Sequence, residues 1–283
     1  MTEQPGDGKE LVHALLHLAE QAGVEAMRFY NGRASFVLKS DSSPLTNADR
    51  ASHDFLMRHL PELLPDVPVI SEESQDPTQG PADVDGRFWL VDPLDGTKEF
   101  LKGTGEFTVN IALIELGKPV IGVVHAPAIG ISYFAALSHG AFRKQHAETS
   151  VPIRIQRANP EALRVVASKD HAGPLVAAML AGLPRAELKS MGSSLKFCLV
   201  AEGSADVYLR DVPTMEWDTA AAQCIVEAAG GGIYTLDGKP LRYGKPGLKN
   251  SAIITVGHPD LAWRSFLGTG AAAAAEVHKA SHC

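Results

Sequence analysis

The stretch Trp89–Thr97, WLVDPLDGT, determines how the rest of the chain is interpreted. The aromatic and β-branched run from Arg87 to Val91 is typical of a buried strand. We expect Asp92-Pro93 to end this strand, because proline has no N–H for the ladder and restricts the residue before it. A second carboxylate, a glycine and a threonine follow at once. The stretch therefore predicts a buried strand that ends in a polar turn.

The turn can aim Asp92 and Asp95 at one point, with the carbonyl group of Leu94 between them. Mg²⁺ prefers such clusters of hard oxygen ligands. The N–H groups of Gly96 and Thr97 are expected to begin a short helix, which is a suitable place for phosphate oxygens. Taken alone, the stretch is explained equally well as an ordinary Asp-Pro turn whose carboxylates cap a helix.

The composition of the 283-residue chain, 45% hydrophobic and 21% charged, is that of a soluble globular protein. Its net charge of −7 argues against nonspecific binding to nucleic acids or anionic membranes, but it fits a cation-dependent site. No apolar run is long enough to span a bilayer, and Met1–Lys9 lacks the apolar core of a signal peptide. Cys198, Cys224 and Cys283 form no zinc or CxxC pattern, which indicates a reducing compartment. We therefore expect a cytoplasmic protein.

Hydrophobic periodicity divides the chain into two halves and a tail. Residues 1–160 are expected to form an α+β half, an antiparallel sheet covered by two N-terminal helices. Its predicted elements are helices at 10–30 and 47–64 and strands at 34–39, 67–70, 87–91, 108–116, 120–125 and 131–137, with a hairpin turn at Gly117-Lys118 and a loop at 75–86.

Residues 161–267 alternate strands and helices, which predicts an α/β half with a mixed, mostly parallel sheet and crossover helices. The predicted strands are 165–167, 187–189, 207–210, 232–235 and 253–256, and the predicted helices are 174–181, 195–202 and 217–229. The boundary is placed near Asn159-Pro160, and residues 268–283 are expected to be a loosely ordered tail.

Four further acidic residues, at three places in the chain, each have an ordinary structural explanation. Glu72 and Glu73 follow a short strand, where adjacent acids are usually solvated. Asp49 stands three residues after Thr46, so that the two can form a capping box. Asp218 lies in the first turn of a predicted helix, where the helix dipole favours a carboxylate.

Together these segments resemble the superfamily of Mg²⁺-dependent, lithium-sensitive phosphatases that includes inositol monophosphatase. The matching motifs occur in order along the chain: Glu72–Ser74, Asp92–Thr97, Trp217–Ala221 and Glu227–Gly231. The likeness runs from the first helix to near Val256. Lys98-Glu99-Phe100 and the segments 41–49 and 192–203 are similar to those of the CysQ-type 3′(2′),5′-bisphosphate nucleotidases. This resemblance implies a layered αβαβα sandwich.

The resemblance also implies residue roles. The metal ligands would be the carboxylates of Glu72 (in preference to Glu73), Asp92, Asp95 and Asp218 and the carbonyl group of Leu94, for two or three Mg²⁺ ions. Asp49 and Thr97, with Glu72, would orient and deprotonate the attacking water. The substrate phosphate would meet the ligand set at Glu72, Leu94, Asp95 and Asp218 and the amides of Gly96 and Thr97.

The implied reaction removes the 3′-phosphate of adenosine 3′,5′-bisphosphate and leaves AMP, in sulfate-donor metabolism; the sulfated form is a second candidate substrate. The partner is thus a small phosphorylated molecule, with a homodimer as the candidate assembly. Alternatives are the same chemistry on inositol 1-phosphate or fructose 1,6-bisphosphate, and a non-catalytic nucleotide or metal sensor. The presence of every metal-site residue and of Thr97 argues against the sensor.

Substrate contacts are less defined by the sequence. Lys196 and Arg210 are candidates for the 5′-phosphate, although solvation at the surface is the simpler interpretation of each. The segment Asp211–Thr214, DVPT, departs from the Phe-Gly-Pro-Thr of the CysQ type, near the place where that family binds the nucleoside.

Overall fold

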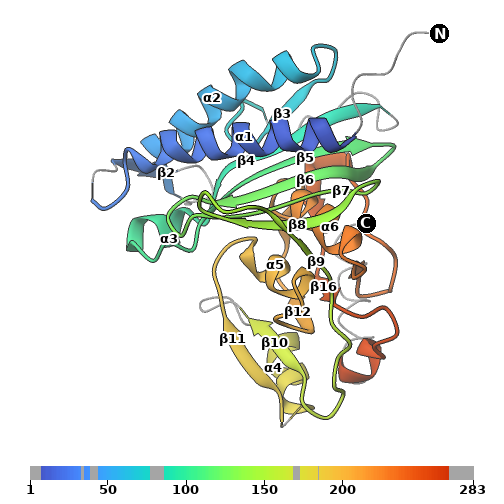
Figure 1. Cartoon of the computed structure of the whole chain (residues 1–283). Helices are drawn as coiled ribbons and strands as arrows, with labels where there is room; N and C mark the ends of the chain where they lie inside the picture. The colour runs from blue at the N-terminus through green and yellow to red at the C-terminus, as the bar shows by residue number, and fades with distance from the viewer. Residues whose placement is uncertain are drawn as a thin grey trace, which may run out of the picture.

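Two stacked β-sheets and the helices around them form five layers in the order αβαβα (Figure 1). The computed structural model describes residues 8–32, 35–38, 44–76, 86–167, 173–183 and 185–267. The helices of these layers are α1 (Gly8–Met27) and α2 (Asn47–Leu63) outside the first sheet, α5 (Leu195–Ala201) and α6 (Ala220–Ala228) between the sheets, and α4 (Pro174–Ala181) outside the second. The expected layered sandwich is confirmed.

The first sheet has seven strands in the spatial order β3-β4-β5-β6-β7-β8-β9. Their bounds are β3 (Val69–Ser71), β4 (Arg87–Asp95), β5 (Thr108–Glu115), β6 (Lys118–Ala126), β7 (Ile131–Ala136), β8 (Gly140–Gln145) and β9 (Val151–Ile153). Neighbours are antiparallel except β3 and β4, which are parallel. The sequence analysis did not predict β8 and β9.

The hairpin between β5 and β6 turns at Leu116-Gly117, one residue before the predicted turn. Both residues have positive φ, 51° and 70°, which a two-residue hairpin turn of type I′ requires. Glu115 consequently pairs directly with Lys118. Lys118 is thus the first residue of β6 rather than part of the turn.

The second sheet has five strands in the order β11-β10-β12-β16-β14. Their bounds are β10 (Arg164–Ala167), β11 (Glu187–Ser190), β12 (Val207–Arg210), β14 (Gly232–Thr235) and β16 (Ile253–Val256). β10 is parallel to β11 and β12, whereas β16 is antiparallel to β12 and β14. The sheet is mixed, as expected, but two of its four strand pairs are antiparallel. The prediction of a mostly parallel sheet is therefore wrong, because β14 and β16 join by antiparallel pairing rather than through crossover helices.

The remaining elements are short. They are β1 (Phe36–Leu38) paired with β2 (Pro44–Thr46), α3 (Thr97–Lys102), β13 (Thr214–Met215) paired with β15 (Lys249–Asn250), and the 3-10 turns η1 (Glu216–Asp218), η2 (Pro246–Leu248) and η3 (Trp263–Leu267). The chain passes from the first sheet to the second between β9 and β10, and the domain boundary near Asn159-Pro160 stays a prediction. The tail at 268–283, residues 41–43 and most of the predicted 75–86 loop lie outside the described residues. No described helix has the length and apolar character needed to cross a membrane.

Alternate residues of each strand of the first sheet belong to different cores. On β5, Ile111 and Leu113 pack with α1 and α2, while Ala112 and Ile114 pack with the inner helices α5 and α6. This alternation follows from the two-residue period of a strand. Asp92 and Asn110, paired across β4 and β5, occupy the row that faces the inner helices, in line with Ala112.

The central strand does not end at Asp92-Pro93, so that prediction is wrong. β4 continues to Asp95 through a bulge between the pairs Asp92–Asn110 and Asp95–Thr108. Pro93 lies inside this bulge, where the ladder is already interrupted and a missing N–H removes no ladder hydrogen bond. One strand can therefore carry both carboxylates.

The helix α6 packs closely on the first sheet at Gly122 on β6, where a Cβ atom would lie 2.4 Å from the carbonyl oxygen of Ala221. We expect Gly122→Ala to lower the free energy of unfolding by about 1–3 kcal/mol, because α6 must move away. The measurement is urea denaturation. Gly247→Ala is the control, because nothing lies within 4 Å of its Cβ position and only a φ of 72° opposes the change, so the loss should be about 1 kcal/mol. Equal losses would contradict the packing argument.

Candidate active site

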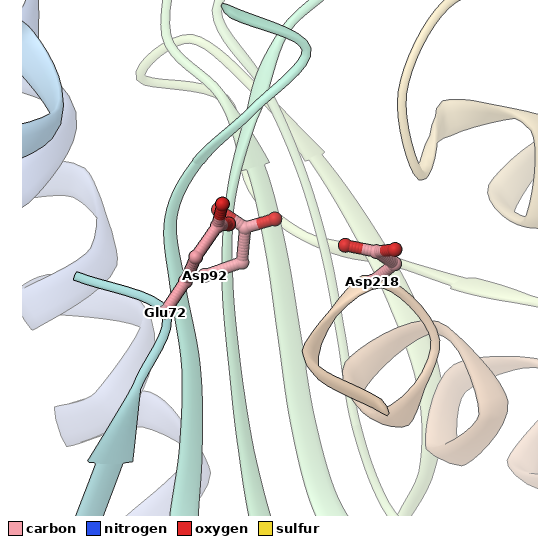
Figure 2. A group of neighbouring side chains, drawn as sticks. All are labelled: Glu72, Asp92 and Asp218. Atoms are coloured by element: carbon pink, nitrogen blue, oxygen red, sulfur yellow. The ribbon is translucent and has the colours of Figure 1, made fainter. Parts of the chain in front are cut away.

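Three carboxylates that are distant in the sequence meet where the two halves of the chain face each other (Figure 2). Glu72 follows β3, Asp92 lies on the neighbouring β4, and Asp218 ends the turn η1 on the opposite side. One carboxylate oxygen of each lies within 4.8 Å of the others. The solvation expected for adjacent acids at 72 and 73 thus does not describe Glu72, which is partly buried and belongs to this cluster.

The cluster is held in place by backbone donors and strained by its own charge. Oδ1 of Asp92 accepts the N–H of Leu94 at 3.0 Å, and Oδ2 of Asp218 accepts the N–H of Met215 at 2.9 Å. Burial, and then the nearby carboxylates, raise the pKa of Asp92 well above its usual range. The same causes raise the pKa of Asp218 to about 7. Fixed donors thus hold carboxylates close together even though their charges repel.

The chemistry of this donor set fits Mg²⁺, because every converging ligand atom is a hard oxygen. The residues that would hold it are Glu72, Asp92, Asp95 and Asp218 and the carbonyl group of Leu94. When bound, Mg²⁺ activates water and stabilises negative charge on a phosphate and on its leaving oxygen. Of these residues, Glu72, Asp92 and Asp218 form the observed cluster. The complete set of metal ligands stays a prediction.

Asp95 approaches the same place but is fixed by the other half of the chain. Its Oδ2 accepts hydrogen bonds from Ser193 Oγ at 2.7 Å and from Ser194 N and Oγ at 2.7 and 2.9 Å. Asn110 Nδ2 lies 3.4 Å from the same oxygen. These four contacts leave Oδ1 as the oxygen that remains for a ligand.

The sequence analysis did not identify Asn110 as a site residue. The only signal was that it is the one polar side chain in the apolar run 109–114 of a strand. Ser193 and Ser194 entered that analysis only as part of the segment 192–203 that resembles the CysQ type.

Asp49 contacts both the N-terminal cap of α2 and the side chain of Thr97. Thr46 caps α2, and Oδ2 of Asp49 accepts the N–H of Thr46 at 2.8 Å, which completes the predicted capping box. Oδ1 of Asp49 accepts the hydroxyl of Thr97 at 3.3 Å, and that hydroxyl lies 3.4 Å from the carbonyl oxygen of Leu94. The structural and the catalytic interpretations of Asp49 are therefore compatible, and its catalytic role stays a prediction.

The helix α3 begins at Thr97, as predicted. Gly96 precedes it with a φ of 92°, a left-handed conformation that residues with a Cβ atom avoid. A Cβ at this position would also lie 3.3 Å from the carbonyl oxygen of Glu106. The binding of phosphate by the N–H groups of Gly96 and Thr97 stays a prediction.

A pocket of about 300 Å³ opens beside Asp95 and Asp218 and extends to Lys196 and Arg210. Lys196 is only 5% exposed, its Nζ donates to the carbonyl oxygen of Ser193 at 2.7 Å, and burial lowers its pKa to about 8. Arg210 is half-buried in the same wall. The interpretation of these two residues as solvated surface cations is therefore wrong; residue type alone does not show that α5 and β12 turn them toward the pocket.

Without divalent cations, the carboxylates of the cluster repel one another once they are ionised. We therefore expect the folded protein to become less stable as the pH rises. The pKa of Asp218 is raised from 3.8 to about 7, so the stability gained from its protonated form is present at low pH and is lost as the pH rises through 7. We expect the Tm of the protein in EDTA to fall between about pH 4 and pH 7 and to level off above pH 7, and Mg²⁺ to raise the Tm more at pH 8 than at pH 5.

The pH dependence of the Tm is compared between wild type and Asp218→Asn, so that contributions of other titrating groups cancel. One such group is His125, because burial lowers its pKa to about 4. The variant should lack most of the fall in Tm. If wild type and variant show the same pH dependence without metal, the electrostatic account of the cluster is wrong.

Comparisons with known proteins agree with this geometry. Residues 7–276 match the profile of the Inositol monophosphatase family. The chain is 46% identical over 235 residues to the 3′(2′),5′-bisphosphate nucleotidase CysQ of Escherichia coli, covering 82% of this chain and 94% of that protein. The crystal structure of CysQ from Bacteroides thetaiotaomicron has a TM-score of 0.74 and 38% identity, covering 89% of this chain and 98% of that one.

The fold is also that of the Thermotoga maritima IMPase, with a TM-score of 0.76 at 24% identity over 95% of this chain and 99% of that one. The match to the family profile covers nearly the whole sequence, and the carboxylates that carry the resemblance converge in space. The chain belongs to the inositol monophosphatase family.

Proposed function

We propose that the protein is a Mg²⁺-dependent phosphomonoesterase that removes the 3′-phosphate of adenosine 3′,5′-bisphosphate and leaves AMP and phosphate. The observation that carries this proposal is the cluster of Glu72, Asp92 and Asp218, whose Asp218 lines a pocket together with Lys196 and Arg210. The substrate carries two phosphates. The 3′-phosphate would bind to cations held by the carboxylates, and the 5′-phosphate would bind to Lys196 and Arg210. The similarity to CysQ of Escherichia coli, named a 3′(2′),5′-bisphosphate nucleotidase, supports the same substrate.

The proposed hydrolysis needs no covalent nucleophile. A water oxygen attacks phosphorus in line with the 3′ oxygen, the phosphorus–oxygen bond to the sugar breaks, and the 3′ oxygen takes up a proton. Thr97 is a weak base by itself, but its hydroxyl donates to Asp49 and can accept a proton from the water. Asp49 and Glu72 are the carboxylates that orient this water and receive its proton.

Lys196 and Arg210 are proposed to bind the 5′-phosphate. Nε of Arg210 is buried and, within the part of the chain that the structure describes, has no hydrogen-bond partner. A buried donor without a partner is costly, and a phosphate oxygen would supply the partner. Lys196 adds a second positive charge in the same pocket wall.

Several expectations remain proposals of the same kind. Two or three Mg²⁺ ions per site, the sulfated nucleotide as a second substrate, a homodimer and a cytoplasmic location all stay predictions. The closest alternative activity is hydrolysis of inositol 1-phosphate or fructose 1,6-bisphosphate by the same carboxylates. A non-catalytic nucleotide or metal sensor is the alternative of a different class.

The proposal is tested by phosphate release in Mg²⁺ from adenosine 3′,5′-bisphosphate, inositol 1-phosphate and fructose 1,6-bisphosphate. We expect kcat/KM for the nucleotide to be about a hundredfold higher or more, equivalent to about 2.7 kcal/mol in transition-state binding. The control is Asp95→Asn, which should lose nearly all turnover. Equal or better turnover of the sugar phosphates would overturn the substrate assignment, and binding of the nucleotide without turnover would favour the sensor.

The role of the two cations predicts a specific kinetic signature. Lys196→Met and Arg210→Met should each raise KM for adenosine 3′,5′-bisphosphate about 10-fold or more, since each loses a charge-assisted contact of about 1.5–3 kcal/mol. KM for adenosine 3′-monophosphate, which lacks the 5′-phosphate, should change less than threefold in the same variants. Equal effects on both substrates would place the 5′-phosphate elsewhere.

A further inference from the structure

The row of β5 side chains that faces the second half of the chain changes character at the site. Ile114 and Ala112 are apolar and belong to the inner core, whereas the next two residues of the row, Asn110 and Thr108, are polar and only 1% and 0% exposed. Burying a polar side chain is costly unless its hydrogen bonds are satisfied. The partners of Asn110 and Thr108 therefore indicate what this change accomplishes.

The partners form a directed network. The hydroxyl of Thr108 lies 2.8 Å from Oδ1 of Asn110 and 2.5 Å from Oγ of Ser193, and it has one proton for the two. Nδ2 of Asn110 points toward the second half, because Oδ2 of Asp95 on that side accepts hydrogen bonds. Nδ2 donates to Oγ of Ser194 at 2.9 Å, and it lies 3.4 Å from Oδ2 of Asp95. Because Oγ of Ser194 accepts from the amide, its single proton is left for its remaining neighbours, which share it.

Those neighbours are two groups of the candidate metal site. Oγ of Ser194 lies 2.9 Å from Oδ2 of Asp95 on the first half and 2.9 Å from the backbone carbonyl oxygen of Asp218 on the second. One hydroxyl thus joins the carboxylate of Asp95 to the turn that carries Asp218. Its orientation depends on Asn110.

We infer that Asn110 is a positioning residue that fixes Asp95 relative to Asp218 through the hydroxyl of Ser194. Asn110 does not line the pocket, so it acts on the reaction only through these neighbours. It holds Oδ2 of Asp95 and leaves Oδ1 for a cation, and it keeps the acidic ligands of the two halves at a constant separation. The catalytic part of this inference rests on the proposed function, whereas the metal-binding part does not.

The test measures Mg²⁺ binding by isothermal titration calorimetry in wild type, Asn110→Ala and Asn110→Leu. The leucine variant keeps most of the side-chain volume, so that a cavity is not the cause of its effect. We expect both variants to bind Mg²⁺ about 10-fold or more weakly, as is usual when the hydrogen-bond partner of a ligand is lost. With adenosine 3′,5′-bisphosphate, kcat at a fixed Mg²⁺ concentration should fall about tenfold while KM changes less than twofold.

The matched control is Ser132→Ala. Ser132 is a buried residue of the same sheet whose hydroxyl pairs with Nδ1 of His125 at 2.8 Å, away from the site. It should lower the Tm as Asn110→Ala does but leave Mg²⁺ affinity unchanged. A double-mutant cycle with Ser194→Ala should show coupling, with the double variant losing no more Mg²⁺ affinity than the weaker-binding single variant.

Wild-type Mg²⁺ affinity in Asn110→Leu overturns the inference, and so does strict additivity with Ser194→Ala. These outcomes do not depend on the substrate. A wild-type protein that binds Mg²⁺ but leaves the bisphosphate intact would instead refute the proposed function, while the Mg²⁺ titrations of the variants would still decide the role of Asn110.

Discussion

The repulsion between carboxylates that the fold holds together is the constraint on which this structure depends. One oxygen from each of Glu72, Asp92 and Asp218 lies within 4.8 Å of the others. Two unit charges 4 Å apart near a protein surface interact by about 4 kcal/mol, so the cluster must gain protons or bind cations. A flexible chain would separate these groups. Strand pairing on one side and the α6 layer on the other prevent that separation, and this rigidity fits the proposed binding of a multivalent cation.

The middle helical layer explains how the second half can supply a ligand with this precision. Asp218 ends the turn that leads into α6, and α6 packs against the first sheet at Gly122, where no side chain separates the two backbones. The small side chains of Ala220 to Ala222 are buried in the same core. The position of Asp218 is thus set by backbone contact with the sheet that carries Asp92. The second sheet supports this helix from the other side.

Much of this arrangement could be predicted from the sequence, because hydrophobic periodicity and three acidic motifs are local signals. The failures share a physical cause. Proline was expected to end β4, but a bulge removes the need for its N–H, and the bulge depends on pairing with β5. The burial of Lys196 depends on how α5 packs, which its residue type does not reveal. Asn110 meets Ser194, a partner 84 residues away. Patterns within a short stretch of sequence do not reveal contacts between residues that are far apart in the chain.

The charge distribution in the pocket also bears on substrate choice. Asp95 and Asp218, two of the proposed metal ligands, line the same 300 Å³ pocket as Lys196 and Arg210. If Arg210 binds the 5′-phosphate as proposed, a substrate with a single phosphate would leave its buried Nε unpaired, and an unsatisfied buried donor costs about 1–3 kcal/mol. A second phosphate alone would also suit a sugar bisphosphate. The apolar side chains of Met191 and Phe197 in the same lining favour a flat base over a hydroxylated ring. Under the proposed function, charge would therefore select for two phosphates, and the apolar wall would select the group that carries them.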